Sequence, residues 1–196
     1  LSLPAVAAGS ETQALWLPLL SMNAELWLDG QRLAATTDAA RGRTTRHWNQ
    51  PWLVSLPRTP MAPGAAYLRV QASAINEGML AAPWLGAIGE LGARHEQIVF
   101  WRVTLPGWGV AFGLSLGLVF LLIRLHDPRQ QAWGYFGAGA VLWSLGNLNL
   151  TVVHMPGPDA WWEAAVHVTQ FAGLMCLVLF GLSYAQALSA RLRRGL

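Results

Sequence analysis

The chain has 196 residues, of which 54% are hydrophobic and only 12% are charged. Soluble domains carry about 25% charged residues, so an ordinary soluble domain cannot account for the whole chain. The net charge of +3 is modest and the arginines are scattered, which excludes the clustered basic face of a nucleic-acid-binding protein.

Residues 1–93 predict a β-rich module. Asp29-Gly30 supplies the positive-φ pair of a tight hairpin turn between two short apolar runs, 24–28 and 31–34. Trp52–Leu56 ends at a proline, and Tyr67–Ala72 alternates between apolar and polar side chains. Four or five such strands indicate an antiparallel β-sandwich. Because a jelly roll has about eight strands, we expect a jelly-roll-like sandwich with strands missing.

Three tryptophans are the candidate ligand-binding residues of this module: Trp48, Trp52 and Trp84. They could form an aromatic platform for a carbohydrate or another small molecule. The alternative is that they pack in the core or at the rim of the sandwich. His47 has no partner at metal-ligand spacing, so no metal site is predicted. Residues 3–8 fit the end of a secretory signal peptide, and they fit an ordinary loop or strand start equally well.

The second half of the chain predicts membrane helices. Val103–Ile123 holds twenty-one residues without an ionisable side chain. At about 1.5 Å per residue it spans roughly 31 Å, which matches a hydrocarbon core of about 30 Å. Two further charge-free stretches follow, at 130–158 and 164–190. We therefore expect a junction at 94–104, a bundle of three transmembrane helices within 105–190 (about 105–125, 132–153 and 164–188), and a cytoplasmic segment starting at 191–196. Buried core helices of a soluble protein are the alternative.

Arginine placement predicts the orientation. The first connection contains Arg124 and Arg129, the second connection (154–163) contains no arginine, and the tail contains Arg191, Arg193 and Arg194. The positive-inside rule places the first connection and the tail in the cytoplasm. The sheet module is then periplasmic on a multi-pass protein of the bacterial inner membrane. Arg94 and Arg102 run against this bias.

Two sets of residues within the predicted helices stand out. Gly109, Gly113 and Gly117 recur every four residues, as in a close helix–helix contact, although glycine is common in membrane helices generally. Polar side chains are expensive in hydrocarbon. We expect a polar cluster that transmits or senses a signal, or alternatively structural hydrogen bonds, from Asn147, Asn149, His167 and Gln170.

The sequence contains no phosphate-binding loop, paired intramembrane carboxylates or nucleophile-with-base signature, so no catalytic residue and no cofactor is predicted in this chain. Trp-Arg-Val-Thr-Leu-Pro at 101–106, the Arg/Pro connection at 124–129 and Leu-Trp-Ser-Leu-Gly-Asn-Leu-Asn-Leu at 142–150 resemble the bacterial seven-transmembrane receptors with diverse intracellular signalling modules (7TMR-DISM). The outer segments 23–30 and 63–67 resemble their jelly-roll input domain.

This resemblance implies an N-terminal or central fragment of a sensor, most similar to the sensor histidine kinase members of a two-component system. ATP, Mg²⁺ and a response regulator would then belong to a kinase module downstream, and a homodimer is a possible assembly. A diguanylate cyclase output is one alternative. A transporter or membrane-enzyme fragment and a membrane-anchored binding protein are the others.

Overall fold

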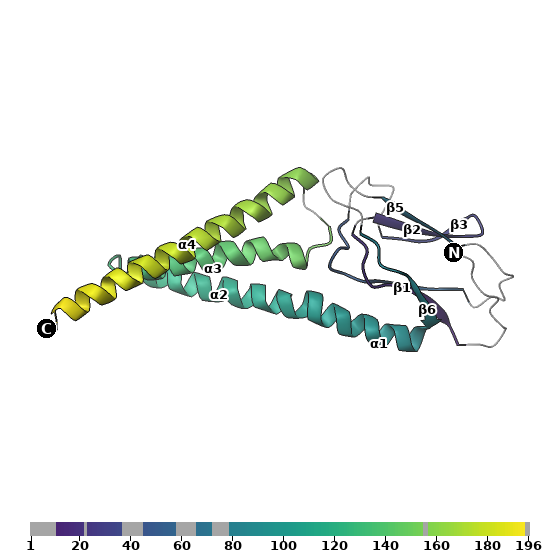
Figure 1. Ribbon diagram of the computed structural model, residues 1–196, viewed down its shortest axis with the longest axis horizontal. Coiled ribbons are helices and arrows are strands. Elements are labelled where there is room, and N and C mark those ends of the chain that lie inside the picture. The colour runs from purple at the N-terminus through teal and green to yellow at the C-terminus, as the bar shows by residue number, and fades with distance from the viewer. Residues whose placement is uncertain are drawn as a thin grey trace. The chain divides into compact units, whose positions relative to one another are not determined.

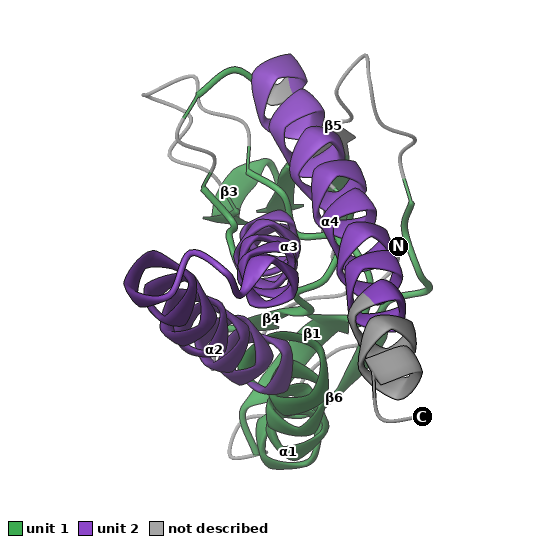
Figure 2. Cartoon of the chain, turned by 90° about the vertical axis from the view of Figure 1, so that its left-hand side faces the viewer, with its two compact units in different colours: residues 1–104, 152–159 green, residues 105–151, 160–196 purple. Residues whose placement is uncertain are grey.

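The computed structural model describes residues 11–21, 23–36, 45–57, 66–71, 79–154 and 157–194. The chain divides into two compact units, which are coloured separately in Figure 2. The first, here called the sheet unit, comprises Leu1–Thr104 and Val152–Asp159. The second, here called the helix unit, comprises Leu105–Thr151 and Ala160–Leu196. Each unit is described by itself.

The sheet unit contains two three-stranded antiparallel sheets, with strand orders β4-β1-β6 and β3-β2-β5 (Figure 1). The strands are β1 (Gln13–Leu17), β2 (Asn23–Leu28), β3 (Gln31–Ala35), β4 (Trp52–Ser55), β5 (Ala66–Gln71) and β6 (Trp84–Ala87). The central strand of each sheet supplies most of the core, because only a central strand is covered by neighbours along both edges. Its main apolar cluster consists of Leu15, Leu17, Leu26, Val54 and Leu56. Burying each leucine contributes roughly 1.5–3 kcal/mol.

The predicted hairpin is confirmed. Asp29 and Gly30 adopt φ values of 47° and 82°, and Leu28 pairs with Gln31 across the turn. Strands β4 and β5 also lie where the apolar and alternating patterns predict them. Strands β1 and β6 were not predicted, although β1 is the centre of its sheet.

Helical residues run without interruption from Ile88 to His126. They form α1 (Ile88–Val99), a π-helical turn η2 (Phe100–Thr104) and α2 (Leu105–His126). Within the sheet unit, α1 buries Leu91 against Ala14 and Trp16 of β1. This contact fixes the start of the helix on the sheet that contains β1.

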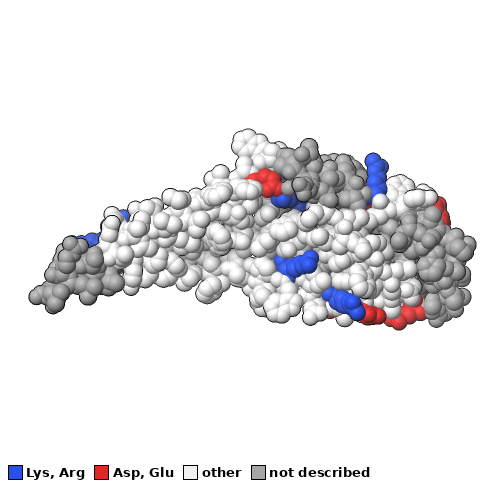
Figure 3. All heavy atoms as spheres, viewed as in Figure 1, with Lys and Arg blue, Asp and Glu red and all other residues white. Residues whose placement is uncertain are grey.

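The helix unit consists of α2, α3 (Gln131–Asn147), a 3₁₀ turn η3 (Leu148–Leu150) and α4, which starts in the sheet unit and spans Asp159–Arg194. Helices α2 and α3 lie side by side in both ribbon views (Figures 1 and 2). The surface of the described helices in Figure 3 is almost free of charged atoms. Large apolar side chains lie on that surface, among them Phe112, Leu125 and Phe171.

The predicted combination of antiparallel β-structure followed by helices is therefore present. Two helices are long and apolar enough to cross a membrane, Ile88–His126 and Ala160–Gln186. The helix expected at about 132–153 is shorter than predicted, because regular α-helix ends at Asn147 after 17 residues and η3 follows. A complete set of three spans and a jelly-roll topology remain predictions.

Candidate functional site

The three candidate tryptophans occupy different environments in the sheet unit. On β1, neighbouring residues Leu17 and Trp16 pair with Trp52 and Trp84 respectively. Successive residues of a strand point to opposite faces, so Trp52 and Trp84 lie on opposite faces of the sheet. Trp52 packs against the leucine cluster, whereas Trp84 is 51% exposed. A platform that uses both rings is not formed, and ligand binding by any one tryptophan stays a prediction.

Trp84 takes part in a small aromatic and cationic group. Its ring centroid lies 6.5 Å from that of Trp16, and the Arg94 guanidinium carbon lies 5.7 Å from its centroid. Arg94 also donates to the Glu90 carboxylate at 3.1 Å, one helical turn away. These contacts give the exposed Trp84 ring a packing role on the face covered by α1.

The 45–50 segment (Thr45-Arg46-His47-Trp48-Asn49-Gln50) makes more long-range polar contacts than the sequence suggested. At its start, Thr45 donates from its backbone nitrogen and its hydroxyl to the Asn23 Oδ1, both at 2.7 Å. Thr45 is 1% exposed and forms a β-bridge with His154. The Arg46 N–H donates to the Val153 carbonyl at 3.0 Å. The start of the segment is therefore bonded to β2 and to residues 153–154, which follow α3 and η3.

At its end, the 45–50 segment bonds to the π-helical turn. The Asn49 side-chain amide donates to the carbonyl oxygen of Arg102. The Arg102 guanidinium in turn donates to the Pro18 carbonyl, just after β1, at 3.3 Å. Arg102 is thus held through both its backbone and its side chain. Sequence reasoning placed 41–50 in a polar loop and did not identify these contacts.

His47 lies between those two attachment points. Both of its ring nitrogens are buried, and neither meets hydrogen-bond geometry with a described residue. Burial is the main cause that lowers the pKa of His47 below its usual value, and the neighbouring His154 lowers the pKa further. The Thr36 carbonyl acts in the opposite direction and is outweighed. The imidazole is therefore neutral near pH 7.

The predicted glycine stripe on α2 divides into two parts. A methyl group built on Gly117 would lie 2.7 Å from Val141 Cγ2 and 2.9 Å from the Gly137 carbonyl oxygen of α3. A methyl on Gly113 would overlap the Ser144 hydroxyl. Nothing lies within 4 Å of the same position on Gly109. Close approach of α2 and α3 therefore requires glycine at 113 and 117 and not at 109.

Helix α3 presents small residues on two faces. Gly137, Val141 and Ser144 face α2, whereas Gly139 and Gly146 face α4. A methyl on Gly139 would lie 3.2 Å from the Gly173 carbonyl oxygen and 3.2 Å from Cys176 Cβ. Sequence reasoning missed these glycines, although their i, i+4, i+7 spacing with neighbouring small residues was a usable signal.

The predicted polar residues do not form one hydrogen-bonded cluster. Asn147 donates to the Trp143 carbonyl of its own helix at 2.7 Å, and the His167 Nδ1 lies 2.8 Å from the Glu163 carbonyl oxygen of its own helix. Asn149 instead accepts a bond from the Trp162 indole at 2.8 Å, which joins η3 to α4. Gln170 packs beside Gly146. These contacts are those of helix-to-backbone and helix-to-helix hydrogen bonding.

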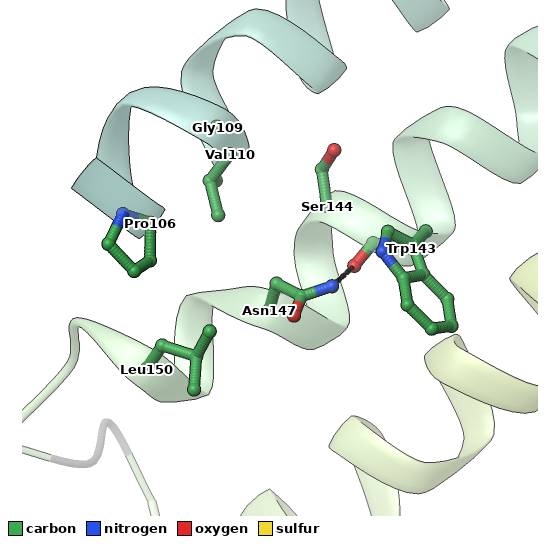
Figure 4. Close-up of a pocket in the computed structure, with 7 residues that line it drawn as sticks. All are labelled: Pro106, Gly109, Val110, Trp143, Ser144, Asn147 and Leu150. Carbon is green, nitrogen blue, oxygen red and sulfur yellow. Dashed lines mark hydrogen bonds between the residues drawn. The ribbon is translucent and has the colours of Figure 1, made fainter. Parts of the chain in front are cut away.

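A cavity of about 240 Å³ opens between α2 and the end of α3 (Figure 4). Its lining is mainly apolar and consists of Pro106, Gly109, Val110, Trp143, Ser144, Asn147 and Leu150. In Figure 4 the Asn147 amide nitrogen is bonded to the Trp143 carbonyl, so this polar group is already used within α3. The cavity shows no convergent set of polar groups that would define a ligand.

An aromatic cluster that sequence reasoning also missed connects the other ends of the helices. Phe120 of α2 stacks on Trp133 of α3 with centroids 4.9 Å apart. Phe180 of α4 lies 5.2 Å from Phe136, and Tyr184 lies 5.8 Å from Phe180. Aromatic pairs at these distances contribute about 0.5–1.5 kcal/mol each beyond area burial.

Among the described residues, no group of three or more histidine, cysteine, aspartate or glutamate side chains could hold a metal ion. Comparisons with models of protein families, with curated proteins and with solved structures find no match to this chain. The functional argument therefore depends on the geometry of the two units and on the sequence resemblance.

Proposed function

We propose that the chain is the input and membrane-spanning part of a transmembrane signalling receptor of the seven-helix bacterial type. The sheet unit is the periplasmic sensor, and the helices lie in the inner membrane. A signalling module, a histidine kinase or a diguanylate cyclase, follows on the cytoplasmic side. A small molecule or a carbohydrate is the class of signal that the exposed Trp84 would suit.

One observation carries this proposal: the same uninterrupted helix serves both environments. It begins as α1, where Leu91 is buried against Ala14 and Trp16. It continues into Val103–Ile123, which contains no ionisable side chain. A movement at the sheet that holds β1 would therefore act directly on a membrane-spanning element, as a receptor requires.

The dimensions of α3 support a third span. Its 17 residues extend for about 25 Å, and the three residues of η3 add about 6 Å. The sum is close to the hydrocarbon thickness of about 30 Å. The Asn149–Trp162 bond lies where α3 ends, and tryptophan is enriched at the membrane interface.

The contacts of the two outer arginines support the proposed orientation. Arg94 bonds to Glu90 and lies over Trp84, while Arg102 bonds to the Pro18 carbonyl. Both side chains therefore have structural partners within the sheet unit. The arginines of the first connection, Arg124 and Arg129, are then the ones that set the cytoplasmic side.

Cysteine labelling tests the membrane topology. In a Cys176→Ala background, Arg69→Cys on β5 and Arg129→Cys after α2 place single thiols on exposed residues. A membrane-impermeant maleimide added to intact spheroplasts should label position 69 and should label position 129 only after lysis. Labelling of both positions before lysis would contradict the proposed orientation.

Proline substitution tests the signalling role. Arg102→Pro in the full-length receptor places a second helix-disrupting residue in η2, so we expect the kinase or cyclase output to become insensitive to the sheet unit while the protein still reaches the membrane. Arg102→Ala, which removes only the guanidinium, is the matched control and should have a smaller effect. An output unchanged by Arg102→Pro would contradict signalling through this helix.

A further inference from the structure

The π-helical turn η2 coincides with a break in the helix's own hydrogen bonding. In an α-helix the carbonyl of residue 102 accepts from the N–H of residue 106. Residue 106 is proline, which has no N–H, so the Arg102 carbonyl loses its regular donor. The Asn49 amide donates to this oxygen. A carbonyl that Pro106 leaves without a donor is thus satisfied by the 45–50 segment.

The same turn has two helical registers within reach. A π-helical turn contains one residue more than the α-helical turn that would replace it. Conversion between the two changes the following residues by about 1.5 Å along the helix axis and about 100° around it. Single π-turns inside α-helices occur frequently at functional sites. The residues that follow η2 are those of the first charge-free span.

The attachment is double at η2 and is continued elsewhere along the 45–50 segment. Arg102 is bonded to Asn49 through its carbonyl and to Pro18 through its guanidinium. Four residues before Asn49, Thr45 pairs with His154, and Arg46 bonds to Val153. A displacement of this short segment would therefore act on the helix at η2 and on residues 153–154 together.

We propose that Asn49 is a latch that holds η2 in its π-helical register by replacing the donor that Pro106 lacks. The latch rests on the proposed receptor function for its biological meaning, since release would rotate the first membrane span. It also specifies the direction of control: the sheet unit favours the π-helical register as long as Asn49 is bonded. The hydrogen bond itself can be tested without any knowledge of the signal.

The test is a double-mutant cycle read by amide hydrogen exchange of the whole protein in lipid nanodiscs. Asn49→Ala should raise the exchange of amides in 100–109 about fivefold, as loss of one net hydrogen bond predicts. Pro106→Ala restores an N–H at the position that can bond to the Arg102 carbonyl, so Asn49→Ala should have little effect in that background. Gln50→Ala, the neighbour on the same turn, is the control and should leave exchange in 100–109 unchanged.

The latch would be overturned if Asn49→Ala raised exchange equally with Pro106 and with Ala at that position, or did not raise it at all. Asn49→Asp, of nearly the same shape, removes the donor and should reproduce the effect of Asn49→Ala. Unchanged protection of β1 and β2 amides checks that the sheets stay folded. If the cycle behaves as expected but receptor output is the same for Asn49→Ala and Gln50→Ala, the latch stands and the signalling function is contradicted.

Discussion

The two units place apolar side chains in opposite locations. In the sheet unit Leu17 is 0% exposed and Leu26 is 1% exposed, and the leucines gather in one cluster. In the helix unit Phe112 is 69% exposed and Leu125 is 76% exposed, while the contacts between helices are made by glycines. The hydrophobic effect builds the first arrangement and cannot favour the second in water. The difference indicates two different solvents around one chain.

Truncation of a core leucine should give the largest effect. Leu17→Ala removes a fully buried side chain, and we expect the free energy of unfolding of the sheet unit to fall by about 2–5 kcal/mol. Hydrogen exchange of β1 amides in detergent measures the change. Phe171→Ala on α4 is the control, because that ring is 67% exposed and should cost under about 0.5 kcal/mol in the sheet unit. Equal losses would remove the contrast between the units.

Substitution at a glycine contact should give the next largest effect. Gly117→Ala forces a methyl group against Val141 and the backbone of Gly137, so we expect a loss of about 1–3 kcal/mol in the stability of the helix unit. Thermal unfolding in detergent measures it. Gly109→Ala has open space around the added methyl and should be neutral or stabilising by up to about 1 kcal/mol. The reverse ranking would mean that α2 and α3 do not pack through Gly117.

The interhelical hydrogen bond should give a smaller effect. Asn149→Ala removes the acceptor of the Trp162 indole bond, and bonds of this kind in membrane proteins contribute about 0.6 kcal/mol on average. Trp162→Ala tests the same bond from the other side. In a double-mutant cycle on the unfolding of the helix unit, we expect the two losses to be less than additive. Full additivity would show that the bond contributes nothing.

Acidification should give the smallest effect, confined to the sheet unit. Because burial lowers the pKa of His47, the unfolded chain binds a proton at a higher pH than the folded chain does. Stability is therefore complete above the usual histidine pKa of about 6.5 and falls as the pH decreases toward the folded-state pKa. Denaturant unfolding at pH 7 and pH 5 should show a smaller decrease for His47→Gln than for the original residue. An unchanged pH dependence would exclude His47 as its source.

Local turn chemistry and hydropathy predicted much of the fold. Asp29-Gly30 identified the hairpin because few residues tolerate two successive positive φ values. Strand β1 escaped prediction because Ala14–Leu17 are all buried, so the alternation that marks a half-exposed strand is missing. Helix α4 starts at Asp159, ahead of the predicted residue 164, because Glu163 lies inside the helix and hydropathy excluded it from the span.

The candidate site was less predictable, since it depends on which polar groups meet. The spacing of Gly113 and Gly117 was visible in the sequence, but only their neighbours distinguish them from Gly109. Asn147 and His167 were expected to meet each other, and each instead bonds to the backbone one turn away. Asn49 and Arg102 are separated by more than fifty residues, and no periodic pattern connects them. The missing donor of Pro106 was the one available signal.

The return of residues 152–159 to the sheet unit has a consequence for domain exchange between receptors. A chimera that transplants only residues 1–104 would leave behind Val153, whose carbonyl accepts the Arg46 N–H, and His154, which pairs with the buried Thr45. The grafted cassette would carry open backbone groups where it was once sealed. A portable sensor built from this protein therefore has to bring the stretch between α3 and α4 with it.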